Sequence, residues 1–80
     1  MLTETQKKAC EGATWKLVVH MNCEDKGVLV HHCEKLNICR EIITPKTNGE
    51  WGKGVATFYF NGGNTGYGSL PEVLASMGIN

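Results

Sequence analysis

The stretch from Gly54 to Asn80 constrains the fold most, because it encodes a strand, a glycine-rich loop and a helix in succession. Residues 55–60, VATFYF, alternate between two faces, as a half-buried strand requires. Ala56, Phe58 and Phe60 share one face of that strand, and Val55, Thr57 and Tyr59 share the other. We therefore expect this strand to bury one side against a helix.

The helix that follows the loop has local signals for its start, its buried side and its end. Ser69 and Glu72 form a capping box, in which the serine accepts from the third helical amide and the glutamate reaches back to the cap amide. Gly78 suits the left-handed position just after the helix. Apolar residues at helical spacing then predict one buried stripe, made of Leu70, Val73, Leu74 and Met77.

The first third of the chain predicts a helix and two strands. Thr3 and Gln6 make a second capping box, so a short helix from about Glu4 to Glu11 is expected. Alternating side chains predict a strand from Thr14 to Met21, and the segment Gly27 to Cys33 should return antiparallel to it.

The middle of the chain contains the strongest hairpin signal. Asn48-Gly49 favours the positive φ angles of a tight type I′ turn. Residues 34–43 fit either a strand or a helical face, and their β-branched residues with Pro45 favour the strand. Gly52 and Gly54 indicate a bulge or a close backbone approach in the next strand. The whole pattern predicts a single α+β domain over residues 1–80: an antiparallel meander of about four strands, with a short N-terminal helix and a C-terminal helix packed on one face.

The charge and hydropathy of the chain argue against two classes of function, strong nucleic-acid binding and membrane insertion. Eight basic residues balance eight acidic ones, so the chain lacks the cationic surface from which strong nucleic-acid binding derives its affinity. Direct nucleic-acid binding is therefore not expected. No apolar run follows a basic start, and none approaches the roughly 20 residues of a membrane span. We expect a cytoplasmic protein whose four cysteines are thiols.

Cysteines and histidines raise two chemical possibilities. Zinc accepts such ligands, but no Cys-x-x-Cys pair occurs, and the predicted strands spread the candidates apart. Catalysis by a Cys33 thiolate beside His31 would also need an orienting group and an oxyanion hole, and no residue pattern supplies them. We expect neither a metal nor a cofactor. The candidate set considered is His20, Cys23, His31, His32, Cys33 and Cys39.

The glycine-rich loop from Asn61 to Gly68 leads into the start of a helix, where amides and the helix dipole can hold a phosphate. It lacks the Gly-Lys-Ser/Thr ending of a P-loop and the spacing of a dinucleotide fingerprint. A small-ligand or nucleotide-binding protein that uses this loop stays open as an alternative.

A protein-binding surface is the leading expectation. Residues 54–80 contain one charged residue, Glu72, and are rich in the Tyr, Asn, Ser and Gly of adaptable binding loops. We expect a non-enzymatic protein that binds another protein or a nucleoprotein complex, of the kind that mobile genetic elements encode against host or defence machinery, including anti-CRISPR-like inhibitors. A homodimer is also open, because a small sheet has edges. The expected partner-binding residues are Tyr59, Asn61, Asn64, Thr65, Tyr67 and Glu72.

Parts of the sequence resemble two known families, and the first resemblance suggests an alternative function. The ending GSLPEVLASMGIN is similar to the last helix of HicA-type messenger-RNA interferase toxins, and the His31-His32 pair is similar to their catalytic histidine. In that family the histidine opens a strand after a Gly-Ser step, whereas this pair closes one. The order helix, strands, helix also resembles a double-stranded RNA-binding domain, although the second helix begins Leu70-Pro71-Glu72 without lysines. The first of these resemblances implies an alternative function, a toxin-like RNA-acting nuclease that uses His31 or His32 as general acid or base.

Overall fold

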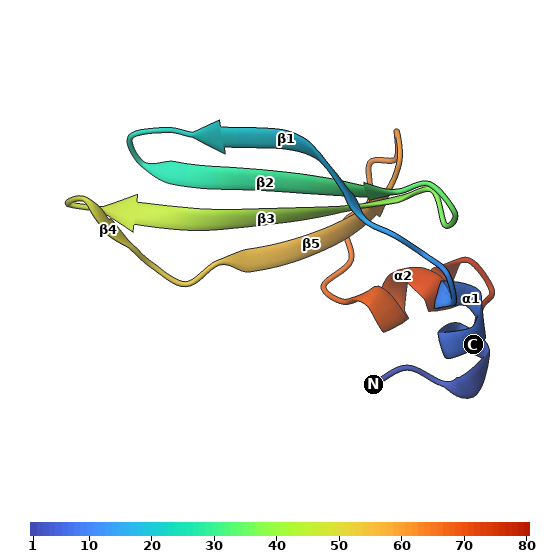
Figure 1. Ribbon diagram of the computed structural model, residues 1–80. Coiled ribbons are helices and arrows are strands. Elements are labelled where there is room, and N and C mark those ends of the chain that lie inside the picture. The colour runs from blue at the N-terminus through green and yellow to red at the C-terminus, as the bar shows by residue number, and fades with distance from the viewer.

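The computed structural model describes residues 1–80 and shows a five-stranded antiparallel sheet with two short helices at one end (Figure 1). The predicted α+β class is confirmed. In chain order the elements are α1 (Glu4–Cys10), β1 (Lys16–Asn22), β2 (Lys26–Cys33), β3 (Ile38–Thr47), β4 (Glu50–Trp51), β5 (Val55–Phe60) and α2 (Leu70–Ser76).

Strands β1, β2 and β3 form a meander, and β4 and β5 both pair with β3 along its far edge. The Asn-Gly turn between β3 and β4 has the expected positive φ angles, 52° at Asn48 and 81° at Gly49. Between β4 and β5 the pairing is interrupted near Gly54, where a Cβ atom would lie 2.9 Å from the hydroxyl oxygen of Thr44. The close neighbour of Gly54 is thus the Thr44 side chain, and the nearest backbone atom, the carbonyl oxygen of Ile43, lies 3.9 Å from that Cβ position. The interruption near Gly54 separates β4 from β5.

Both helices begin at the capping residues predicted from the sequence, Thr3 and Ser69. Thr3 and Gln6 make both hydrogen bonds of the predicted capping box. Ser69 accepts from the amide of Glu72, but the Glu72 carboxylate accepts from the amide of Gly68, one residue before the expected cap amide. The ambiguous segment is divided, since residues 34–37 form a turn and residues 38–47 form β3. Neither helix is long and apolar enough to cross a membrane.

Paired residues of antiparallel strands share a face, so the registers divide the sheet into two faces. We call the side against which the helices pack the helix face, and the other side the open face. The helix face carries Leu17, His20, Asn22, Gly27, Leu29, His31, Cys33, Ile38, Arg40, Ile42, Thr44, Ala56, Phe58 and Phe60. The open face carries Lys16, Val19, Met21, Lys26, Val28, Val30, His32, Cys39, Glu41, Ile43, Pro45, Val55, Thr57 and Tyr59.

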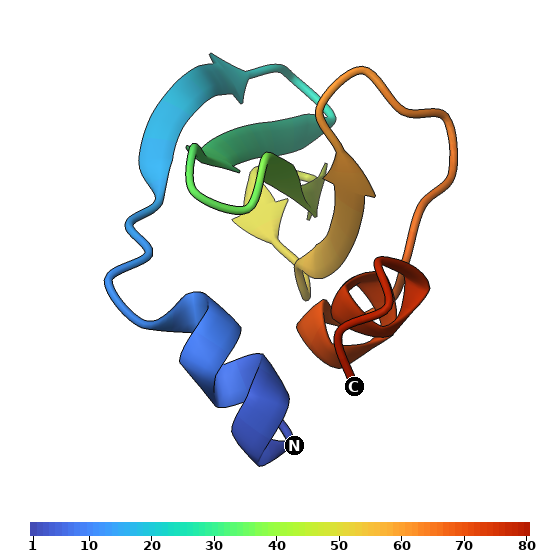
Figure 2. The ribbon, with the colours of Figure 1, turned by 90° about the vertical axis from the view of Figure 1, so that its right-hand side faces the viewer.

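The main core lies at the helix end of the sheet. Five buried residues form it, with Phe58 and Phe60 packed around them: Cys33, Leu36, Ile38, Val73 and Leu74. Trp15 adds an edge-to-face contact with Phe58 at 6.3 Å between ring centroids. Seen along the sheet, both helices lie below one end of the strands (Figure 2). The core therefore holds one end of the sheet and leaves the other without a covering layer.

The molecule is elongated as a consequence. Its extents are 44 × 23 × 21 Å and its radius of gyration is 13.9 Å, whereas a compact 80-residue domain has about 12 Å. Its accessible surface is 5440 Å², against about 4,800 Å² for a typical monomer of this mass. Only nine of the 80 residues are buried. The molecule therefore exposes more surface than a compact domain of its mass.

Candidate functional site

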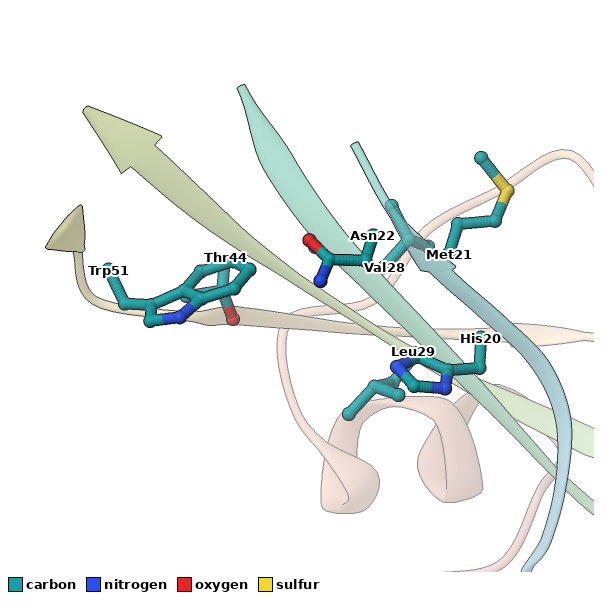
Figure 3. Close-up of a pocket in the computed structure, with 8 residues that line it drawn as sticks. His20, Met21, Asn22, Val28, Leu29, Thr44 and Trp51 are labelled. Carbon is teal, nitrogen blue, oxygen red and sulfur yellow. The ribbon is translucent and has the colours of Figure 1, made fainter. Parts of the chain in front are cut away.

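A hollow of about 240 Å³ lies on the helix face of the sheet, at the end away from the helices. It is formed by the ends of β1 and β2, by β3, and by the indole of Trp51 from β4 (Figure 3). The residues that line it are His20, Met21, Asn22, Gly27, Val28, Leu29, Thr44 and Trp51. We call it the Trp51 pocket.

Trp51 is held over the sheet by the tight turn that precedes it. The turn folds β4 back so that Trp51 pairs with Lys46, and the Lys46 ammonium lies 5.0 Å from the indole centroid. The six-membered ring of the indole reaches Gly27, where a Cβ atom would come within 2.9 Å of Cζ3. Only glycine allows this approach without displacement. The indole nevertheless remains 52% exposed.

Polar groups surround the apolar floor of the pocket. His20 and Asn22 belong to the exposed strand β1, and Thr44 lies beside the Trp51 indole (Figure 3). The side chain of Met21 points away from them, as expected for a residue of the open face. Pockets for drug-sized ligands hold roughly 300–1,000 Å³, so this smaller hollow suits one large side chain. The indole wall favours an aromatic side chain from a partner. The hydroxyl, amide and imidazole groups around it favour one that ends in a polar group, as tyrosine does.

The predicted partner-binding residues are distributed over two faces and a loop. Tyr59 lies half-buried on the open face, next to buried Cys39. Asn61, Asn64 and Thr65 are exposed in the loop that follows β5. The Asn61 amide oxygen lies 4.0 Å from the Cys39 sulfur, which places the start of this loop at the border of the open face.

Tyr67 and Glu72 lie on the other side of the molecule. Tyr67 exchanges two backbone hydrogen bonds with Phe58, at 2.8 and 2.7 Å, and its ring makes an edge-to-face contact with Phe60. Tyr67 therefore packs around the main core, and the exposed Glu72 caps α2. The structure does not bring Tyr59 and Tyr67 together.

The cysteines and histidines do not converge, and no three metal-ligating side chains gather at one point. All four cysteines are free thiols, and Cys33 and Cys39 are buried on opposite faces. The two adjacent histidines also face opposite ways. His32 contacts Asn37 at 3.3 Å, while the buried Nδ1 of His31 has no hydrogen-bond partner. His31 and His32 therefore cannot act as a pair on one substrate.

Arg40 is a second feature of the helix face. It pairs with His31 across β2 and β3, and its guanidinium lies 5.0 Å from the Trp15 ring centroid. Its buried Nε has no hydrogen-bond partner. No acidic residue belongs to the helix face of the paired strands. With Lys46 near the pocket, this face favours neutral or acidic contacts from a partner.

The fold lowers the acidity of Tyr59. Burial raises the pKa of its phenol above the usual 10.0, and the neighbouring Cys39 and Glu41 raise it further. A tyrosine with a raised pKa stabilises the folded state while it is protonated, so this contribution is complete below pH 10 and is lost as the pH rises through the higher folded pKa. Tyr59 thus stays neutral over the physiological range.

This pKa shift predicts an alkaline difference between the wild type and Tyr59→Phe. Above about pH 10, the wild type should lose stability more steeply than the variant, which has no phenol to ionise at that position. Urea unfolding across the alkaline range measures the two slopes. Below pH 10 the difference between the two proteins should be constant, and parallel curves above that pH would contradict the assignment.

None of the pocket residues was among the expected partner-binding residues, and His20 was singled out only as a candidate metal ligand. Gly27 within a strand was the available signal, because a strand glycine often marks close approach by another group. Two turns of the chain separate Trp51 from Gly27. Their contact could therefore be predicted only from the register of the strands between them. None of the family models, curated proteins or solved structures compared with this chain matches it.

Proposed function

We propose that this chain is a non-enzymatic protein-binding module, which holds a side chain of another protein in the Trp51 pocket. The observation that carries the proposal is the exposed indole poised over Gly27 on a part of the sheet that no helix covers. Interfaces gain most of their energy where a few large side chains fill such pockets. The pocket is open to a partner without rearrangement of the core.

The surroundings of the pocket define the chemistry of the partner. Lys46 stacks on the indole and Arg40 lies further along the same face, so an arginine or lysine anchor would meet like charge. A tyrosine or another aromatic side chain would stack on Trp51 and could hydrogen-bond with Asn22 or Thr44. A neutral or acidic segment around the anchor would match the basic groups.

The edge of β1 extends the same surface. All seven residues of β1 are exposed, and its outer side pairs with no other strand. An edge strand of this kind can accept an added strand from a partner. The pocket and the edge adjoin at His20 and Asn22, so one extended segment could use both.

Blocking a host or defence complex, as proteins of mobile genetic elements do, is one use that such a module would serve. The exposed loop residues Asn61, Asn64 and Thr65 remain a predicted secondary contact surface. They stand at the border of the open face, on the far side of the sheet from the Trp51 pocket.

The test is capture of partners from a cell lysate, followed by binding measurements with the purified partner. Trp51→Ala removes the pocket wall, and Gly27→Val fills the pocket from its floor. Each should weaken binding by roughly tenfold or more, as loss of a central anchor does. Met77→Ala alters an exposed apolar residue of the helix end and should bind like the wild type. Equal affinity of all four proteins would place the contact elsewhere.

A further inference from the structure

Arg40 is the only arginine of the chain, and it lies on the helix face between the main core and the Trp51 pocket. Along β3, this face carries Ile38 of the main core at one end and Thr44 of the pocket toward the other. The buried Nε of Arg40 has no hydrogen-bond partner, and the one ion pair of the chain joins Lys7 to Glu4. Arg40 is thus without an acidic partner in its own chain.

The neighbours of Arg40 hold its guanidinium in place without supplying negative charge. The guanidinium lies 5.0 Å from the centroid of the Trp15 ring, and Arg40 pairs with His31 on one side and with Phe58 on the other. The buried Nδ1 of His31 also lacks a hydrogen-bond partner. Buried polar atoms without partners are few in folded proteins, and a bound ligand is one explanation for them.

The guanidinium remains open to such a ligand. Of its nitrogens, only Nε is buried without a partner, so the two terminal nitrogens can reach a group outside the chain. A planar guanidinium that is already stacked on a ring loses little freedom when it forms hydrogen bonds.

We propose that Arg40 binds a carboxylate of the same partner segment whose aromatic side chain enters the Trp51 pocket. The inference rests on the proposed function and adds a second contact to it. Arginine suits a carboxylate because its donors match both oxygens, and no acidic residue belongs to the helix face of the paired strands to compete for it. Phosphates also pair with arginine, but one arginine in a chain of balanced charge lacks the cationic surface that nucleic-acid binding uses.

The register of the sheet sets the spacing between the two contacts. Gly27, which lies against the Trp51 indole, pairs with Thr44, and Thr44 is four residues from Arg40 along β3. That separation is about 13 Å. An extended segment that runs along the strands turns every second side chain toward the sheet, so its aromatic and acidic residues should be four positions apart. The side chain between them would lie over apolar Leu29 and Ile42, which pair with each other.

Nuclear magnetic resonance of the full chain can follow Arg40 directly, because a chain with one arginine gives one Nε–H side-chain signal. The probe is an acetylated and amidated nonapeptide with tyrosine at its centre and glutamate at both ends, so that either direction of binding places a carboxylate four positions from the ring. It should shift the signals of Arg40 Nε–H and of the Trp51 indole N–H. A peptide with glutamine at both ends should shift only the Trp51 signal, and its dissociation constant should be roughly tenfold higher, as for a lost hydrogen bond to a charged group.

Variants of the chain assign this preference to Arg40. Arg40→Gln should bind the glutamate and glutamine peptides equally, with the weaker constant. Lys16→Gln removes the same charge from an exposed position of the open face and should keep the roughly tenfold preference of the wild type. Moving both glutamates to two positions from the tyrosine should remove the Arg40 shift, because the carboxylates then lie over Leu29 and Ile42.

The peptides separate this inference from the proposed function. Equal affinity of the wild type for the glutamate and glutamine peptides would overturn the carboxylate contact and leave the pocket proposal intact. If replacing the central tyrosine with serine changed nothing while the glutamates still mattered, the pocket proposal would fail and the Arg40 contact would stand. A single-stranded oligonucleotide that shifts the Arg40 signal at concentrations where the glutamate peptide does not would identify phosphate as the ligand and would also overturn the inference.

Discussion

Replacing Leu74 with alanine is expected to lower the free energy of unfolding by about 2–5 kcal/mol, the usual cost of emptying a buried leucine site. Leu74 is fully buried in the main core with Ile38 and Val73. A chain of 80 residues has roughly 4–12 kcal/mol of stability in total. The variant should therefore lose a large part of its stability, since the second buried cluster, around Val28, is smaller.

Urea unfolding followed by circular dichroism measures this effect. Met77→Ala is the matched control, because Met77 lies one helical turn beyond Val73 but is 37% exposed. It should cost less than about 1 kcal/mol, as surface substitutions do. Similar losses for both variants would show that the core does not reside where the structure places it.

Gln6→Met should lower the free energy of unfolding by about 1–3 kcal/mol, the cost of leaving hydrogen-bonding groups without partners. Gln6 is a buried polar residue, 4% exposed. Its Nε2 donates to the carbonyl oxygens of Pro71 and Ile79, at 3.3 and 3.1 Å, and its Oε1 accepts from the amide of Thr3. Methionine has a similar length but supplies none of these bonds.

The same substitution should release α1 from α2. The polar side chain of Gln6 ties α1 to both ends of the C-terminal segment, and the apolar contacts of α1 come from small residues such as Ala9 and Cys10. Hydrogen exchange of the α1 amides should therefore accelerate more than that of β3. Lys8→Ala, at an exposed position of the same helix, should stay within about 0.5 kcal/mol of the wild type. If α1 exchanged at the wild-type rate in Gln6→Met, the docking role of Gln6 would be wrong.

Local sequence signals predicted the elements well. Alternation in residues 55–60 placed Phe58 and Phe60 on one face, which in the structure packs against α2. The Asn-Gly pair predicted the β3–β4 turn. Two capping residues, Thr3 and Ser69, marked the helix starts. These features depend on neighbours in the chain, so a local pattern is sufficient to find them.

The position of the site could not be predicted in the same way. Alternation indicates which residues share a face of the sheet. It does not indicate how much of that face the helices cover, so the uncovered end of the sheet could not be predicted from the sequence. Tyr67 was expected at the surface because it belongs to the polar, glycine-rich loop from Asn61 to Gly68. Its backbone bridge to Phe58 spans the whole glycine-rich loop, and its ring contacts Phe60. The Trp51 pocket likewise needs Gly27 and β4 to meet through the register of β2 and β3.

Hydrogen exchange of the chain with and without its purified partner, at one fixed chain concentration, tests most directly where the chain binds. If the Trp51 pocket and the edge of β1 form the binding surface, bound partner will slow exchange in residues 16–29 and 44–51. Protection confined to the loop and helix of residues 61–76, with residues 44–51 unchanged, would contradict that assignment.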